Sequence, residues 1–201
     1  MDFGALIQSV LYLISSSLFY PALAVLLGAF VTIVAALGAF LAEWAERARL
    51  KQPAPADWPA ILRGRRHISH FLGGTLDELH NLLNRPEGAS WPEVENLWQS
   101  ARRRAYKRLD YLRVLVRVGP STGLIATLIP MSTGLAALSQ GDMSRLSADM
   151  VVAFTATVVG LAVGVTAFVL YSVRSRWAEN DLEVLELVMD SRAAAKLGTT
   201  P

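Results

Sequence analysis

The sequence is poor in charged residues and keeps them out of three long stretches. Charged residues make up 18% of the 201 residues, whereas about 25% is usual in soluble domains. No Asp, Glu, Lys or Arg occurs in residues 3–42, 118–141 or 150–173. Each stretch has the roughly 20 residues that a helix needs to cross a bilayer. These absences exclude an ordinary soluble domain and predict an all-α integral membrane protein with three transmembrane helices.

Cysteine is absent, which excludes disulfides, thiolate metal sites and cysteine nucleophiles. The three histidines, His67, His70 and His80, could share a metal in principle. No cysteine or well-placed carboxylate completes such a set, so a solvated helix face is the favoured interpretation. No combination of nucleophile, base and orienting residue can be assembled either. We therefore expect that the protein is not an enzyme and that it holds no metal and no cofactor.

Asp, Glu, His, Lys and Arg are all missing from the second and third stretches. Pumps and transporters normally need a carboxylate or a histidine within the membrane, so we expect that this chain does not relay protons by itself. The polar groups of these stretches are hydroxyls, which in membrane helices commonly bond to backbone carbonyls or bridge neighbouring helices. The hydroxyls belong to Ser121, Thr122, Thr127, Ser132, Thr133, Thr155, Thr157 and Thr166.

Positive charge is unevenly placed along the chain. Fourteen of the nineteen Lys and Arg residues lie in residues 43–117, four follow Val173, and only Arg145 lies between the second and third stretches. Because cytoplasmic flanks of membrane spans are rich in Lys and Arg, we expect the N-terminus outside and the C-terminus in the cytoplasm. The basic run at 102–108 could bind nucleic acid. A topology signal that contacts anionic lipids explains it more simply, so no nucleic-acid partner is expected, and docking of a cytoplasmic partner stays open.

The order of apolar, basic and helix-breaking segments predicts the organisation of the chain. The capping-box spacing of Ser90 and Glu93 predicts a long helix that continues without a breaker into the second span. Apolar periodicity predicts a further helix within residues 61–83. The expected segments are an interfacial or periplasmic helix (1–17), a first span (18–42), a cytoplasmic helical region (43–112), a second span (113–139), a periplasmic loop (140–149), a third span (150–173) and a cytoplasmic helix and tail (174–201).

Small residues and prolines mark places where the spans can pack closely or bend. Ala156, Gly160 and Gly164 are spaced four apart, so one face of the third span can approach another helix closely, and Gly123 is the expected packing residue in the second span. Pro120 and Pro130 each remove a helix hydrogen bond in the second span. Each therefore introduces either a static kink or a local gate.

Two segments of these spans resemble a known family. Residues 119–131, Gly-Pro-Ser-Thr-Gly-Leu-Ile-Ala-Thr-Leu-Ile-Pro-Met, resemble the Pro-x-x-Gly-Leu-x-Gly-Thr-Val-x-Gly-Met segment of the MotA/TolQ/ExbB proton channel family. Residues 153–162 are similar to its Ala-Leu-x-Ala-Thr-x-x-Gly-Leu-x-Ala segment. Three spans with a cytoplasmic stretch after the first resemble the ExbB/TolQ branch. The chain departs from the pattern at Val152, Thr166 and Pro130, where that family has glutamate, proline and glycine.

The resemblance implies a ring-forming subunit in a bacterial or archaeal cytoplasmic (inner) membrane. A homopentamer would surround a dimer of a single-span ExbD/TolR/MotB-like partner that carries a membrane Asp. The complex would use the motive force of H⁺ or Na⁺ to do mechanical work for protein transport or envelope processes. The implied ion-pathway residues are Thr127, Thr157, Thr122 and Thr155, and the implied gating or coupling residues are Pro120 and Pro130. The alternative is a non-conducting oligomeric membrane scaffold that docks a cytoplasmic partner.

Overall fold

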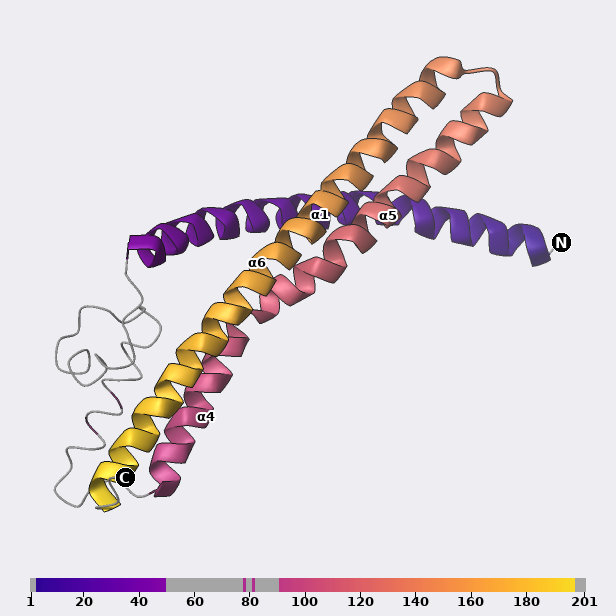
Figure 1. The fold of residues 1–201 in the computed structure, drawn as a ribbon. Coiled ribbons are helices and arrows are strands. Elements are labelled where there is room, and N and C mark those ends of the chain that lie inside the picture. Colours follow the sequence, from indigo (N-terminus) through magenta and orange to yellow (C-terminus); the bar gives the residue numbers. More distant parts are fainter. Residues whose placement is uncertain (1–2, 50–77, 79–80, 82–90, 198–201) are drawn as a thin grey trace. The chain divides into compact units, whose positions relative to one another are not determined.

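The computed structural model describes residues 3–49, 78, 81 and 91–197, and its long elements are all helices. They are α1 (Phe3–Arg49), α4 (Trp91–Lys107), α5 (Asp110–Ser139) and α6 (Met143–Leu197), as Figure 1 shows. No strand occurs within the described ranges. The all-α class expected from the sequence is therefore confirmed.

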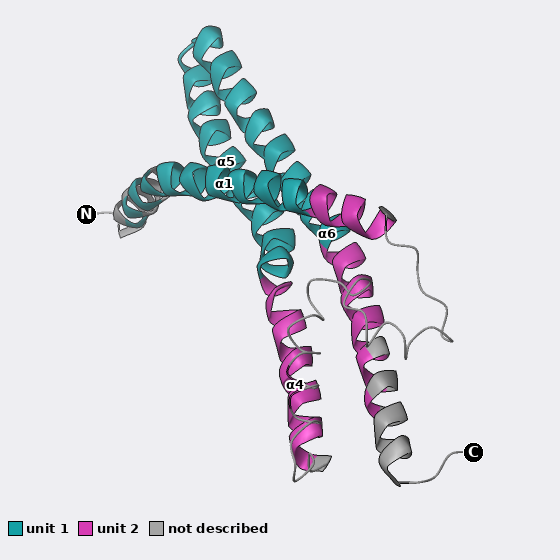
Figure 2. Ribbon diagram, turned by 90° about the vertical axis from the view of Figure 1, so that its left-hand side faces the viewer, with its two compact units in different colours: residues 1–39, 111–170 teal, residues 40–110, 171–201 magenta. Residues whose placement is uncertain are grey.

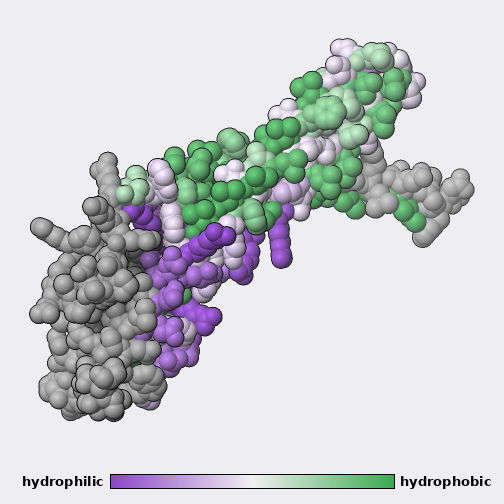
Figure 3. Space-filling view, in the orientation of Figure 1, coloured by the Kyte–Doolittle hydropathy of each residue, from purple (hydrophilic) through white to green (hydrophobic). Residues whose placement is uncertain are grey.

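Within the described residues, three helical stretches are long and apolar enough to cross a membrane. They are Ser17–Ala48, Pro92–Ser139 and Met143–Glu183. Hydrophobic side chains cover much of the visible surface of α5 and α6 in Figure 3, and Leu128, Phe154 and Phe168 are among the large exposed ones. Apolar side chains that face outward on long helices suit lipid or a neighbouring membrane helix.

The chain divides into two compact units, which Figure 2 colours separately. Unit 1 comprises residues 1–39 and 111–170, and it contains most of α1, most of α5 and the first half of α6. Unit 2 comprises residues 40–110 and 171–201, and it contains the end of α1, all of α4 and the rest of α6. The charge-free parts of the three apolar stretches therefore lie almost entirely in unit 1.

A tight turn in unit 1 joins α5 to α6. Gly141 has a φ of 78°, a conformation that glycine adopts without strain. Asp142 then caps α6, because its Oδ1 accepts a hydrogen bond from the backbone N–H of Arg145 at 3.0 Å. This cap starts the helix at Met143, so most of the expected loop at 140–149 is helical.

The first helix of the chain is continuous through Pro21. Ser17 lies inside α1, where its hydroxyl donates to the carbonyl of Leu13, 3.0 Å away. A proline inside a helix removes one backbone hydrogen bond without necessarily ending the helix in a membrane. The boundary between an interfacial segment (1–17) and a span (18–42) stays a prediction, because no break in α1 marks it.

In unit 2, α4 buries the apolar face that its residue spacing predicts, with Val94, Leu97, Ala101 and Ala105 all buried. The expected continuous helix is interrupted after Lys107 by a two-residue turn, in which the N–H of Leu109 bonds to the carbonyl of Tyr106 at 2.9 Å. This three-residue step tightens the chain before α5 begins. Apart from residues 78 and 81, the helix expected within 61–83, and with it the three histidines, lies outside the described residues.

Candidate ion pathway and the helix contacts around it

The backbones of α5 and α6 approach each other through glycines in unit 1. A Cβ on Gly160 would lie 2.8 Å from the carbonyl oxygen of Gly119 and 2.8 Å from the Cα of Gly123. A Cβ on Gly123 would in turn lie 3.1 Å from the carbonyl oxygen of Ala156. Close backbone approach of this kind is how membrane helices gain van der Waals contact without long side chains.

Pro120 occupies the space that a side chain at residue 164 would need. A Cβ on Gly164 would lie 2.5 Å from the Cγ and 2.7 Å from the Cδ of the Pro120 ring. Pro130, further along α5, is buried, and α5 remains helical across both prolines. The Pro120 ring is thus packed directly on α6, and a part for either proline in gating or coupling stays a prediction.

The four threonines expected to line an ion pathway differ in their exposure. Thr127 and Thr122 are buried, with 6% and 8% of their surface exposed. Thr157 is half-buried, and Thr155 is exposed and donates its hydroxyl to the carbonyl of Val151 at 2.8 Å. The four side chains therefore do not share one environment within a single copy of the chain.

Thr127 and Thr157 both direct their hydroxyl protons to their own helix. Thr127 Oγ1 donates to the carbonyl of Leu124 at 2.7 Å, and Thr157 Oγ1 donates more weakly to the carbonyl of Ala153 at 3.4 Å. This is the back-bonding common for hydroxyls in membrane helices. A hydroxyl that donates to the backbone still has lone pairs, so each oxygen can accept a hydrogen bond from a further group.

These two threonines lie at the level of unit 1 at which three helices meet. Leu26 of α1 packs in one buried cluster with Ala126 of α5 and Ala156 of α6. Thr127 and Thr157 follow these alanines directly in the sequence. The structure therefore brings the two threonines to the same level of unit 1.

Comparison with known protein families decides the identity of this arrangement. The sequence model of the MotA/TolQ/ExbB proton channel family matches residues 74–187, more than half of the chain. The chain belongs to this family. No curated protein and no solved structure matches it. The matched range of the MotA/TolQ/ExbB family includes α4, α5, the apolar part of α6 and every candidate ion-pathway, gating and packing residue named above, so the family resemblance of the sequence is confirmed.

One polar contact in this MotA/TolQ/ExbB protein lies at the edge of the charge-free stretches, and the sequence analysis missed it. Thr133 Oγ1 of α5 lies 2.8 Å from Asp149 Oδ2 of α6. Asp149 is the last charged residue before the charge-free stretch 150–173. The one indication of this contact in the sequence was an acid at the border of a membrane segment. Because a loop was expected at this position, there was no reason from the sequence to pair Asp149 with α5.

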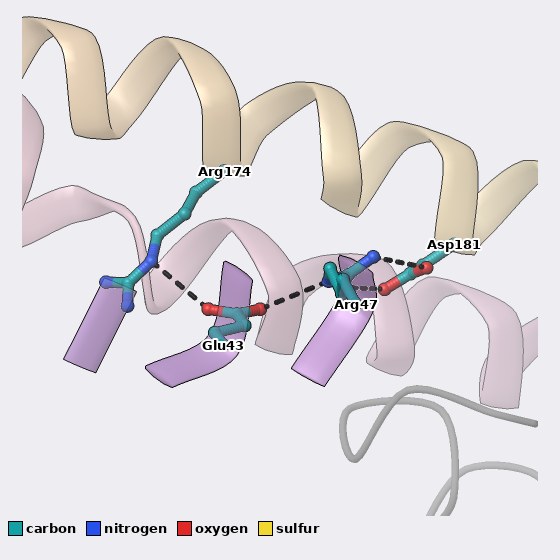
Figure 4. A network of polar contacts seen from close by, with 4 residues as sticks. All are labelled: Glu43, Arg47, Arg174 and Asp181. Carbon is teal, nitrogen blue, oxygen red and sulfur yellow. Dashed lines mark hydrogen bonds and ion pairs between the residues drawn. The ribbon is translucent and has the colours of Figure 1, made fainter. Parts of the chain in front are cut away.

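A second set of polar contacts lies in unit 2 and links the end of α1 to α6, as Figure 4 shows. Arg47 donates two hydrogen bonds to the carboxylate of Asp181, at 2.8 and 3.4 Å. Glu43 lies between the two arginines, 3.6 Å from Arg47 Nε and 3.3 Å from Arg174 Nε. Glu43 and Arg47 are four residues apart on α1. The contacts between α1 and α6 join residues more than 100 positions apart in the sequence, so no local pattern predicts them.

Aromatic rings cover this network. The rings of Phe40 and Trp177 stack at 5.3 Å with an interplanar angle of 5°. The guanidinium of Arg47 lies over the Trp177 ring, 4.8 Å from its centroid. Stacking and cation–π contacts of this kind add to the attraction of the ion pair. The end of α1 is thus held on α6 by both polar and apolar contacts within unit 2.

The described part of the chain contains no group of three or more His, Asp or Glu residues that could hold a metal. The histidines weighed as ligands, His67, His70 and His80, lie outside that part.

Proposed function

We propose that this chain is a ring-forming subunit of an ion-driven motor of the ExbB/TolQ branch. About five copies would surround a dimer of a single-span partner whose membrane Asp carries the ion. The observation that carries this proposal is that 118–141 and 150–173 contain no Asp, Glu, His, Lys or Arg although they lie inside the part matched by a proton channel family. A channel built from such helices needs the charge carrier to come from another chain.

The hydroxyls of Thr127 and Thr157 suit a partner acid that is neutral while it passes. Both donate to backbone carbonyls and keep lone pairs, so each can accept a hydrogen bond from a protonated carboxyl group or a water. An ionised carboxylate would find no free hydroxyl proton there and would bear the high cost of a charge in the membrane. These contacts favour H⁺ as the ion, carried on the partner's acid.

Movement would follow from the electrical work of ion passage. One charge that crosses 100 mV releases about 2.3 kcal/mol, enough to bias a step of an inner dimer relative to a ring. Pro120 packs on Gly164, and such a step could press on this contact between α5 and α6. The output we propose is mechanical work for protein transport or for processes of the envelope.

We also propose that the chain lies in the cytoplasmic (inner) membrane with its N-terminus outside and its C-terminus in the cytoplasm. The concentration of Lys and Arg in residues 43–117 and after Val173 supports this orientation. Because the chain has no cysteine, single substitutions Gln140→Cys and Arg103→Cys can be labelled with an impermeant maleimide on intact cells. Labelling of only the first is expected, and labelling of only the second would reverse the topology.

The pathway is tested by replacing the two threonines together, Thr127→Val with Thr157→Val. Valine has nearly the same shape as threonine but lacks the hydroxyl, so the motor should lose ion-driven output while the ring still assembles. Thr32→Val is the matched control, because Thr32 is an exposed hydroxyl of α1 that back-bonds to Gly28 at 2.7 Å. Unchanged output from the double variant would count against an ion pathway lined by these two hydroxyls.

The assembly is tested by native mass spectrometry of the complex, purified through a tag on this chain from its own host. Five copies with two copies of a single-span protein that carries a membrane Asp are expected. A different copy number with no such partner, reproduced in lipid nanodiscs, would favour the scaffold. In that case Thr127 and Thr157 would be ordinary helix-packing residues.

A further inference from the structure

The contact between Thr133 and Asp149 joins α5 to α6 near the turn that connects them in unit 1. Both side chains are half-buried, and the Oγ1–Oδ2 distance is 2.8 Å. Gly134 brings the helices together at this level, since a Cβ there would lie 3.4 Å from the Cβ of Asp149 and 3.2 Å from Leu146 Cδ1. The carboxyl group is therefore held against α5 and is not a freely solvated surface acid.

Thr133 has one hydroxyl proton and two acceptors. Its Oγ1 lies 2.8 Å from Asp149 Oδ2 and 3.1 Å from the carbonyl oxygen of Pro130. If Asp149 is ionised, the hydroxyl proton can point to only one of these oxygens. If Asp149 is protonated, its O–H donates to Thr133 Oγ1 and the Thr133 hydroxyl donates to Pro130, so both short contacts become hydrogen bonds. The geometry thus accommodates a neutral Asp149 fully.

Few charges surround this pair. Arg145, one turn earlier on α6, is exposed, and Asp142 is engaged as the helix cap through the N–H of Arg145. On the packed face of α5 no charged residue follows Arg117 before the end of the helix, and the 3–42 part of α1 carries none. An ionised Asp149 has no cation on the 3–42 part of α1 or on this part of α5 to offset its charge.

We propose that Asp149 is a proton-exchange site of this subunit and that Thr133 is its positioning residue. A hydronium ion at the turn end of the hairpin gives its proton to the Asp149 carboxylate and becomes water. The new O–H donates to Thr133, whose own hydroxyl turns to Pro130. Release reverses these steps and passes the proton to water or to a carboxylate of the partner. The inference rests on the proposed function, and it adds a named acid to a subunit whose charge-free stretches have none.

The proton can be observed on the full-length chain in lipid nanodiscs by infrared difference spectroscopy between alkaline and acid pH. A band from the C=O stretch of a neutral carboxyl should be lost in Asp149→Asn. The same band should shift in Thr133→Val and return to its original frequency in Thr133→Ser, which restores the hydroxyl. Asp142→Asn is the control, because Asp142 is an exposed acid of the same hairpin, and the Asp149 band should persist in it at its original frequency.

The absence of any band that depends on Asp149, or a band insensitive to Thr133→Val, would overturn the proposal. A band that disappears when NaCl replaces choline chloride at constant pH would also overturn it. In that case the carboxylate, hydroxyl and carbonyl oxygens would bind Na⁺ in place of a proton.

This measurement needs neither the partner nor a driven output, so its result is independent of the motor assay. In the assembled motor, Asp149→Asn should lose proton-driven output and Asp149→Glu should retain part of it. Output that is lost in the Thr127 and Thr157 double variant but normal in Asp149→Asn would refute the exchange site and leave the proposed function in place. An Asp149 band, together with no ion-driven output from the native complex, would support the exchange site and refute the proposed function.

Discussion

The carbonyl oxygen of Gly119 in α5 lies where a side chain at residue 160 of α6 would begin, because a Cβ on Gly160 would be 2.8 Å from it. Gly160 is buried, and the atoms on the other side are backbone, which cannot turn away as a long side chain can. The distance between the two helix backbones in unit 1 therefore depends on the absence of a single methyl group.

Gly160→Ala should destabilise the hairpin by about 1–3 kcal/mol, since the helices must separate to admit the methyl group. Thermal and denaturant unfolding of the chain in detergent would measure the loss. Gly28→Ala is the control, because a Cβ there meets nothing within 4 Å, and its effect should stay within about 1 kcal/mol of zero. Equal stability of the two variants would show that the backbones are further apart.

Arg47→Met should lower the free energy of unfolding by about 1–3 kcal/mol, because it removes both hydrogen bonds that Arg47 donates to Asp181. The side chain of Asp181 is only 12% exposed, so water replaces the lost donors poorly. A double-mutant cycle with Asp181→Asn isolates the pair. Arg104→Met is the comparison, since Arg104 and Glu78 are each about half exposed and their pair should contribute no more than about 1 kcal/mol. A coupling energy for Arg47 and Asp181 no larger than this would contradict the expectation.

Asp142→Ala should cost about 0.5–2 kcal/mol, because it removes the carboxylate that accepts the N–H of Arg145 at the start of α6. Asp142→Asn should be nearly neutral, since asparagine caps helices as well as aspartate does. Hydrogen exchange of the first turn of α6 would report the change locally. Equal protection of this turn in both variants would mean that the side chain does not hold the helix end.

Thr157→Asp should impair assembly or output, because an uncompensated carboxylate within a span costs about 2.5–3.5 kcal/mol on insertion scales. Ser139→Asp makes the same chemical change at the exposed end of α5 and should be tolerated. Copy number from native mass spectrometry, together with the driven output, measures both variants. Normal assembly with normal output of Thr157→Asp would show that Thr157 does not face the ion pathway.

Much of the fold follows from local patterns in the sequence. An apolar stretch without charge, such as 150–173, is stable in a bilayer as a helix, because a helix makes all its backbone hydrogen bonds internally. The spans could therefore be predicted from the sequence alone. The buried face of α4 also followed from residue spacing. The sequence predicted a loop over residues 140–149, whereas α6 starts at Met143. The charges of this region suggest a loop, and the cap at Asp142 that starts the helix depends on a single side-chain contact.

The candidate site was less predictable. The sequence indicated hydroxyls in the spans, but it could not tell that Thr127 is buried while Thr155 is exposed, because exposure depends on which helix faces which. It also gave no reason to pair Thr133 with Asp149, since the rotation of α5 against α6 selects the partner of each residue.

The sequence by itself determined that this is a helical membrane protein of the MotA/TolQ/ExbB family, because hydropathy, charge placement and motif order are properties of short segments. Only the tertiary structure decided which groups meet across helices, including the Gly119–Gly160 contact, the Arg47–Asp181 ion pair and the Thr133–Asp149 pair. The physical reason is that close packing and hydrogen bonding act over a few ångströms, and the residues that come so close are set by how the helices pack.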